Sequence, residues 1–433
     1  MRILKKKSEI ETFLKLLRKR AAGIDPSTDK AVRAILADVK KKGDVSVEKY
    51  TQRFDRHDLP LRLKAAEIKK YAAKAGKNSI RALEIAATRI RIFHEKQKER
   101  SWSYKANGEV LGQIIRPLAR VGVYVPGGKA SYPSTVLMNV IPALVAGVNE
   151  IALCVPTPGG EINPYVMAAI ELLGVREVYR IGGAQAIGAM AYGTKIINKV
   201  DKIVGPGNIY VALAKKMVFG EVAIDMIAGP SEILIIADAT ANPTFVAADM
   251  VSQAEHDELA SSILVTDSER LIIEVAGDIK KQVRFLNRMD IAKRSLKRFG
   301  AIILADDIGK ACVIANSIAP EHLEVMTANP EKALDFIHNA GAVFLGAWTP
   351  EPLGDYAAGP NHTLPTGGTA RFSSPLGVYD FVKRTSILQF DRKSFMQLAD
   401  TVEAIAGVEG LEAHANTIRV RRDYIKEQSR KQF

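Results

Sequence analysis

A regular alternation of strand-like and helix-like segments constrains the fold of this chain more than any other sequence feature. From about residue 111, short runs rich in β-branched residues appear, and most are followed by a Gly, Pro or Asp turn and then a helical pattern. The runs are Val121–Val125, Glu150–Val155, Glu177–Ile181, Lys202–Val204, Glu232–Ile236, Ser262–Val265, Ala301–Leu304 and Ala342–Phe344. This order predicts parallel α/β sheets built from βαβ units.

The alternation runs through the sequence twice. Residues 151–213 read as strand, turn and helix three times over, and residues 233–314 repeat much of that order with different residues. We therefore expect two related α/β units with a cleft between them. Because ligands in open α/β sheets bind beyond the carboxyl ends of the strands, we expect the catalytic residues there.

Helical patterns flank this region on both sides. The first 105 or so residues read as helices, and Asp25-Pro26-Ser27-Thr28 supplies a capping signal for the second of them. The helices are expected at Ser8–Ala21, Thr28–Lys41, Val45–Phe54, Ala65–Lys74 and Ile80–Lys98. Residues 377–433 return to helix and carry His414, so this segment must fold back onto a site in its own subunit or in a neighbour's.

The positive charge of the chain lies away from its potential chemistry. The net charge is +13, but residues 1–100 hold 28 Lys and Arg against 13 Asp and Glu, and residues 419–433 hold 6 against 2. Residues 101–418 therefore carry a net charge of −6. No nucleic-acid recognition motif accompanies the basic arms, so a nucleic-acid partner is not expected.

Other bulk features indicate a cytoplasmic globular protein. No apolar run reaches the roughly 18 residues that a membrane helix needs. The basic start lacks the apolar stretch of a secretory signal. Cys154 and Cys312 lie in apolar segments, where we interpret them as small buried side chains.

Three Gly-rich turns each follow a strand-like run and precede a helix. They are Val125-Pro-Gly-Gly128, Ile181-Gly-Gly-Ala-Gln-Ala-Ile-Gly188 and Val204-Gly-Pro-Gly-Asn208. Such turns present backbone N–H groups at a positive helix end, which suits a pyrophosphate. None is a complete dinucleotide motif, and no acidic residue follows in the expected frame. Tight turns that need glycine for a positive φ are the alternative for any single one.

Four of the seven histidines lie inside short runs that also contain Asp, Glu or Gln, which indicates metal binding or proton transfer: His256, His322, His362 and His414. Gln253 and His256 are spaced i, i+3 in a predicted helix, Phe245–Ala260, so both side chains could reach one ion. The alternative is that they are an ordinary pair of surface side chains without a ligand. With Asp355 and His414 they make a nitrogen and oxygen ligand set without thiolate. Such a set suits a metal that keeps positions open for substrate.

Glu321 and His322 follow Pro320 and form a second acid-base cluster. An imidazole with a pKa near ~6.5 can take an alcohol proton, and a carboxylate beside it can activate water. A helix N-terminus with Glu in its first turn is the alternative. His362 lies in an aperiodic loop that either positions a ligand or is a turn stabilised by Asn361. The remaining histidines have no comparable cluster around them and are expected on the surface or on helix faces: His57, His94 and His338.

The motifs in this order resemble the histidinol dehydrogenase family over essentially the whole chain. The resemblance is carried by Arg120–Gly128, Ile181–Ala186, Val204–Asn208, Ala228–Glu232, Ser252–Asp257, Ala319–His322, Gly354–Asp355, Gly359–Thr366 and Glu409–His414. It implies the last step of histidine biosynthesis, in which L-histidinol is oxidised to L-histidine through the aldehyde in two NAD-dependent steps, with one zinc ion per subunit. It also implies a homodimer with a site shared between subunits.

The resemblance assigns roles residue by residue. It implies that the metal ligands are Gln253, His256, Asp355 and His414, and that Glu321 and His322 are the acid-base pair. The substrate contacts that it implies are Ser231, Gln253, His256, His322, Asp355, His362, Glu409 and His414. The implied NAD contacts are Tyr124, Gln185 and Asn208.

Residues and resemblance together predict two similar incomplete Rossmann-like parallel-sheet domains facing a cleft, plus helical N- and C-terminal segments. The predicted division is a helical arm at 1–24, a discontinuous α/β domain at 25–118 with 233–376, a second α/β domain at 119–232, and a helical segment at 377–433. A paralogous zinc and NAD alcohol dehydrogenase for another small alcohol is the alternative. A zinc hydrolase would not need three Gly-rich turns.

Overall fold

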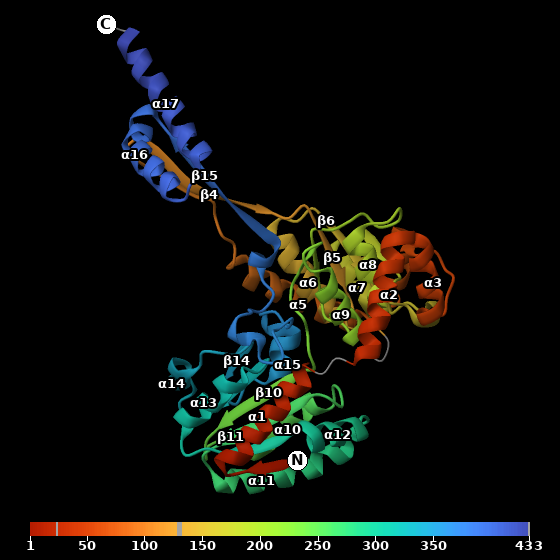
Figure 1. The fold of residues 1–433 in the computed structure, drawn as a ribbon. Coiled ribbons are helices and arrows are strands. Elements are labelled where there is room, and N and C mark those ends of the chain that lie inside the picture. The colour runs from red at the N-terminus through yellow and green to blue at the C-terminus, as the bar shows by residue number, and fades with distance from the viewer. Residues whose placement is uncertain (23–24, 128–131, 432–433) are drawn as a thin grey trace. The chain divides into compact units, whose positions relative to one another are not determined.

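The computed structural model describes residues 1–22, 25–127 and 132–431, and the chain divides into two compact units. Unit 1 comprises Met1–Lys98 and Leu118–Phe381, and unit 2 comprises Glu99–Pro117 and Val382–Phe433. Within the described ranges the strands form three sheets, two in unit 1 and one in unit 2 (Figure 1). None of the helices in these ranges has the length and apolar character that crossing a membrane requires.

The first sheet of unit 1 is entirely parallel, as the alternation predicted. Its strand order is β1-β12-β11-β10-β13-β14. The strands are β1 (Arg2–Leu4), β12 (Ala301–Leu304), β11 (Ser261–Thr266), β10 (Glu232–Ala237), β13 (His322–Met326) and β14 (Ala342–Leu345). The arm at 1–24, expected to be helical, therefore begins with an edge strand; its predicted end at 23–24 lies outside the described residues.

Helices cover both faces of the first sheet. Ile233 and Ile235 of β10 pack with α10, α11 and α12, whereas Leu234 and Ile236 pack with α1 and α13. A strand buried on both faces reads as a continuous apolar run, because successive side chains point to opposite sides. The helices are α1 (Lys7–Ala22), α10 (Pro243–Ala254), α11 (Glu269–Gln282), α12 (Met289–Phe299) and α13 (Ile308–Ile318), with the shorter α14 (Pro330–Ala333) and α15 (Glu351–Leu353) following β13 and β14.

The second sheet of unit 1 has the order β2-β7-β6-β5-β8-β9 and is parallel except for β2. Its strands are β2 (Arg62–Leu63), β7 (Glu177–Tyr179), β6 (Glu150–Cys154), β5 (Arg120–Tyr124), β8 (Lys202–Val204) and β9 (Ala223–Ile224). The Gly-rich turns follow the carboxyl ends of β5, β7 and β8. This is the edge where we expected dinucleotide-binding loops.

The N-terminal helices cover this second sheet, which differs from the predicted grouping of residues 25–118 with 233–376. The apolar stripe of α2, from Val32 to Val39, packs with the α8 side of the sheet, and α4 contacts α7. Helix α5 also contacts the segment 354–358. The covering helices are α2 (Pro26–Lys42), α3 (Asp44–Asp55), α4 (Ala65–Ala72), α5 (Lys77–Glu95), α6 (Pro133–Ala146), α7 (Pro164–Leu173), α8 (Gly183–Tyr192) and α9 (Ile209–Val218).

Unit 2 contains a small antiparallel sheet that the sequence did not predict. Its order is β15-β4-β3, formed by β15 (Val382–Phe390), β4 (Glu109–Pro117) and β3 (Trp102–Ala106), and its helices are α16 (Arg392–Val408) and α17 (Glu412–Lys431). The prediction that residues 377–433 are wholly helical was wrong for β15. The partner strand β4 lies about 270 residues earlier, and this pairing has no local sequence signal.

A buried ion pair fixes the turn after β8. The ammonium of Lys215 pairs with the carboxylate of Asp225, and both side chains are almost fully buried. Lys215 Nζ also donates to the carbonyl of Gly205 at 2.8 Å, and the Gly205 N–H donates to Asp225 Oδ2 at 2.8 Å. The pair thus holds both backbone groups of one residue, which has a φ of 110°.

Replacing Gly205 with Ala should destabilise the protein more than replacing Gly220 with Ala. Both residues have a positive φ, which costs an L-residue about 1–2 kcal/mol. A Cβ at Gly205 would also lie 2.1 Å from the carbonyl oxygen of Tyr124, whereas a Cβ at Gly220 meets nothing within 4 Å. Thermal unfolding of the two variants tests this, and equal losses in midpoint would contradict it.

Candidate functional site

The Glu321–His322 pair lies at the amino end of a strand of the first sheet. Glu321 directly precedes β13 and His322 is its first residue, so neither begins a helix. Ser231 directly precedes the neighbouring strand β10, and Ile233 lies opposite His322 in the ladder. The expectation that catalytic candidates gather at carboxyl ends was therefore wrong for this sheet. That rule describes loops that leave strands, whereas these residues lie in segments that enter them.

The main chain of Glu232 holds both members of the pair. Its N–H donates to Glu321 Oε2 at 2.9 Å, and its carbonyl oxygen lies 3.0 Å from His322 Nδ1, which donates to it. Glu321 and His322 are only 7% and 3% exposed. Since Nδ1 is occupied by a carbonyl, Nε2 is the ring atom available for proton transfer.

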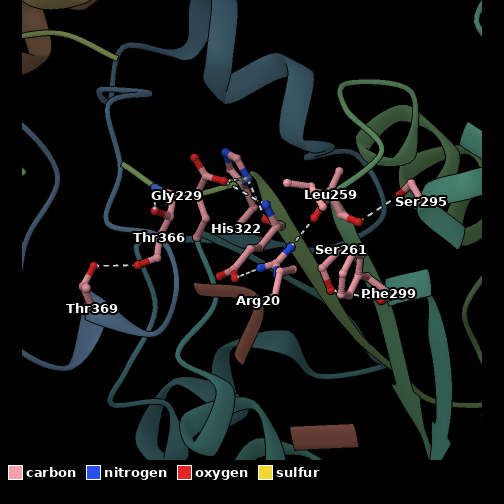
Figure 2. A network of polar contacts seen from close by, with 12 residues as sticks. Arg20, Gly229, Leu259, Ser261, Ser295, Phe299, His322, Thr366 and Thr369 are labelled. Atoms are coloured by element: carbon pink, nitrogen blue, oxygen red, sulfur yellow. Dashed lines mark hydrogen bonds and ion pairs between the residues drawn. The ribbon is translucent and has the colours of Figure 1, made fainter. Parts of the chain in front are cut away.

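The side chain of Glu232 pairs with Arg20, which arrives from α1. Arg20 also donates from its guanidinium to the carbonyl of Leu259 at 2.7 Å, and its side chain is 1% exposed (Figure 2). Sequence reasoning missed Arg20, because one buried arginine cannot be told from the other basic residues of the arm. Glu232 could have been found from its place beside Ser231.

The carboxylates of Glu321 and Asp355 raise the pKa of His322. Burial lowers the pKa of His322, but Glu321 and Asp355 outweigh it and raise that pKa to about 10. Its Nε2 lies 3.4 Å from Asp355 Oδ1. Burial raises the pKa of Glu321 to about 7, against the opposing effect of His322. The neighbouring carboxylates thus favour the protonated form of the ring.

Glu351 is a further acidic residue at this place that the sequence analysis did not single out. Ligand atoms of His322, Glu351 and Asp355 all lie within 4.8 Å of one another. Burial raises the pKa of Glu351 to about 8, and its backbone N–H donates to Glu324 Oε1 at 2.7 Å. Its spacing of four residues from Asp355 was the available signal, because that spacing places two side chains on one helical face.

Gln253 and His256 lie at the end of α10. The helix ends at Ala254 and not at residue 260 as predicted, so His256 lies in the following turn, where its N–H donates to the Gln253 carbonyl at 3.2 Å. Gln253 is 0% exposed, and both its side-chain amide atoms lack a hydrogen-bond partner. His256 is exposed as a residue. Desolvation lowers the pKa of its ring and the charge of Asp355 raises it, so His256 lies within electrostatic reach of Asp355.

The loop that carries His362 lies next to Asp355. His362 Nδ1 donates to the carbonyl of Asp355 at 3.0 Å, which fixes the orientation of the ring. Asn361 anchors the loop by donating to the carbonyl of Met138 at 2.6 Å and accepting from the Thr363 N–H at 2.9 Å. The sequence allowed either a turn stabilised by Asn361 or a loop that positions a ligand. These two interpretations are compatible, because the turn that Asn361 stabilises also orients His362.

The three residues expected to contact a dinucleotide lie at the Gly-rich turns of the second sheet. The Tyr124 hydroxyl accepts from the Gly183 N–H at 3.1 Å. Gln185 is 1% exposed, and both its amide atoms are without a partner. Asn208 caps α9 by accepting from the N–H groups of Tyr210 and Val211. Gly128, the last residue of the first turn, lies outside the described residues.

Two predicted site residues belong to unit 2. Glu409 follows α16 and His414 lies in the first turn of α17, and both are exposed within that unit. Their roles at the site of unit 1 stay predictions.

Two of the three histidines that were expected on the surface or on helix faces are buried. His338 is exposed as predicted, but His57 and His94 are buried and bonded to Thr157 and to the carbonyl of Ile90. These two are structural core histidines.

Comparison with known proteins gives one consistent answer. The family model described as histidinol dehydrogenase matches residues 18–422. Histidinol dehydrogenase of Aquifex aeolicus is 54% identical over 413 residues, covering 95% of this chain and 96% of that protein. The Geobacter sulfurreducens protein of the same name is 53% identical over 398 residues, covering 91% and 93%. The crystal structure of histidinol dehydrogenase from Elizabethkingia anophelis superposes with a TM-score of 0.93 at 38% identity, covering 98% and 99%.

The chain is therefore an enzyme of the oxidoreductase class, with an α/β architecture that matches a solved dehydrogenase across nearly its whole length. Within that class it belongs to the histidinol dehydrogenase family.

Replacing Arg20 with Met should lower the free energy of unfolding by about 3–5 kcal/mol, because Glu232 would be left as an unpaired buried charge. The exposed Arg18 on the same helix is the control, and Arg18→Met should change stability by less than about 0.5 kcal/mol. The double variant Arg20→Met with Glu232→Met should recover part of the loss. Denaturant unfolding measures all three, and similar stabilities for Arg20→Met and Arg18→Met would refute the assignment.

Proposed function

We propose that this protein catalyses the last step of histidine biosynthesis, the zinc-dependent oxidation of L-histidinol through L-histidinaldehyde to L-histidine by two molecules of NAD⁺. Family membership over residues 18–422 supports the reaction and the small-molecule substrate. The observation that carries the metal assignment is the unpartnered buried amide of Gln253, three residues before His256, whose pKa the charge of Asp355 raises.

The residues present fit a zinc ion. An amide buried without hydrogen bonds costs about 1–3 kcal/mol, so the fold keeps Gln253 at a penalty that a ligand to its oxygen would remove. Imidazole and carboxylate complete a ligand set of nitrogen and oxygen, which zinc accepts in sites that stay open to substrate. We therefore assign Gln253, His256 and Asp355 as residues that hold zinc, with His414 as the fourth ligand that the resemblance implies.

The acid-base pair would carry the proton transfers. When bound, zinc would anchor the amino alcohol through nitrogen, and NAD⁺ would accept hydride at each oxidation. His322 would take the hydroxyl proton at Nε2, while the Glu232 carbonyl fixes the ring through Nδ1. A cation held by Asp355 would offset the effect of that carboxylate on the pKa of His322, which would favour the neutral ring that a base requires.

Glu321 would serve the second oxidation. The Glu232 N–H holds its Oε2, and its pKa near 7 is suited to taking a proton from the water that hydrates the aldehyde. A cysteine nucleophile is not supported, because burial raises the pKa of Cys154 and of Cys312. We therefore favour a route through the hydrated aldehyde over a thiohemiacetal.

We also propose a cytoplasmic homodimer whose site is shared between subunits. Ser231 and His362 would contact the substrate from unit 1, and Glu409 and His414 would do so from unit 2. Glu409 and His414 are exposed within unit 2, and the same unit exposes large apolar side chains such as Leu388 and Val408. Tyr124, Gln185 and Asn208 would contact NAD⁺. The alternative function is the oxidation of another small alcohol. It is tested by comparing NADH formation from that alcohol with NADH formation from histidinol.

Replacing Gln253 with Met should abolish zinc binding without destabilising the zinc-free protein. Removing an unpartnered buried amide in favour of an apolar side chain of similar shape is neutral or stabilising. Zinc content, thermal midpoint and histidinol-dependent NADH formation are measured together, and Gln52→Met, at an exposed position, is the control. Chelation should remove NADH formation in the unsubstituted protein, and zinc should restore it. Full zinc occupancy in Gln253→Met would exclude Gln253 as a ligand.

Replacing His322 with Asn should reduce turnover by at least about 100-fold while zinc stays bound, because proton transfer is lost but the proposed ligands remain. His338→Asn, at an exposed histidine, and Cys312→Ala should keep nearly full turnover. Steady-state NADH formation with metal analysis is the measurement. Turnover of His322→Asn near that of the parent would remove this residue as the base.

A further inference from the structure

Asp55 is a buried carboxylate that the site described above leaves unused. It is the last residue of α3 and is 7% exposed. Its Oδ2 is fully buried and has no hydrogen-bond partner within normal geometry. Across residues 1–22, 25–127 and 132–431, no Lys, Arg or His forms an ion pair with it. A buried acid in this state needs an explanation.

The Asp55 side chain destabilises the folded state in more than one way. Burial raises the pKa of Asp55 to about 6, and the nearby N–H of Gly182 offsets only part of that rise. A carboxylate at the last position of a helix also faces the negative end of the helix dipole. The next residue, Arg56, has a left-handed backbone with a φ of 58°. Such costs concentrated at one position are typical of a functional residue.

The neighbours of Asp55 show where a ligand would bind. A Cβ at Gly182 would lie 3.4 Å from Asp55 Oδ2, so the carboxylate lies against the turn that joins β7 to α8. In the same turn the Gly183 N–H donates to the Tyr124 hydroxyl at 3.1 Å. Gln185, in the first turn of α8, adds a buried amide without partners. Two unsatisfied side chains thus meet at one helix N-terminus.

We propose that the Asp55 carboxylate accepts hydrogen bonds from the adenosine ribose of NAD⁺ and selects NAD⁺ over NADP⁺. This inference rests on the proposed NAD role of the second sheet. In parallel α/β sheets an acidic residue commonly binds that ribose and disfavours a 2′-phosphate. The sequence has no such residue in the usual frame after its Gly-rich turns, and α3 supplies one from a different direction. A 2′-phosphate would meet a desolvated negative charge there.

Calorimetric titration of the zinc-loaded, full-length protein with NAD⁺ and with NADP⁺ tests this inference. Asp55→Asn should weaken NAD⁺ binding about tenfold or more, because hydrogen bonds to a charged acceptor are lost. NADP⁺ binding should be unchanged or tighter, so the ratio of the two affinities should fall. The thermal midpoint at pH 8 should equal or exceed that of the parent, because a carboxylate with a raised pKa destabilises the fold above that pKa.

The exposed Asp58→Asn is the matched control and should change none of these quantities. If Asp55→Asn folds poorly, Asp55→Ser is the second variant and should shift the ratio in the same direction. An unchanged ratio of the NAD⁺ and NADP⁺ affinities would overturn the proposal, even if NAD⁺ bound more weakly. A lower thermal midpoint together with an equal loss of affinity for NAD⁺ and NADP⁺ would also overturn it. A parent protein that binds no NAD⁺ would instead overturn the proposed function itself.

Discussion

The Glu232 backbone, at the start of β10 and next to the paired strand β13, is the constraint on which the rest of the site depends. One residue presents an N–H to Glu321 and a carbonyl to His322, so two neighbouring side chains are oriented by a single peptide segment. Because these groups are on rigid strands rather than on a free loop, their geometry does not depend on a bound ligand. The side chain of the same residue is neutralised by Arg20, which lets this segment lie in a buried position.

Unpartnered buried side-chain atoms occur in both regions to which we assign function, and also elsewhere, for example at Thr51 and Ser262. Gln253 lies near the acid-base pair, and Gln185 and Asp55 lie at the turns of the second sheet, each with polar atoms that the fold leaves without partners. By contrast, the buried Lys215–Asp225 ion pair makes further hydrogen bonds to the backbone of Gly205, so its role is structural. Buried polar atoms that are satisfied rigidify a fold, whereas an unpartnered one requires an explanation, and a bound ligand is the one that we propose for Gln253, Gln185 and Asp55.

Much of the fold was readable from the sequence because it depends on local patterns. The apolar runs of β10 and β11 and the Gly-rich turns after β5, β7 and β8 signal parallel strands by composition alone. The pairing of β15 with β4 and the packing of α2 on the second sheet were not predicted, because both depend on contacts between distant segments. The same holds for the site: Glu321 and His322 stand out in a motif, but Arg20 becomes recognisable only when α1 brings it to Glu232.

The central claim is that segments from α10, from the start of β13 and from residues 354–362 converge on one divalent cation and its amino-alcohol ligand. The most direct measurement is an anomalous diffraction map at the zinc absorption edge from crystals of the protein with zinc and histidinol. The account predicts one strong peak per subunit within bonding distance of Gln253, His256 and Asp355, with substrate nitrogen beside it. A peak bound elsewhere, with the Gln253 amide still unpartnered, would contradict it.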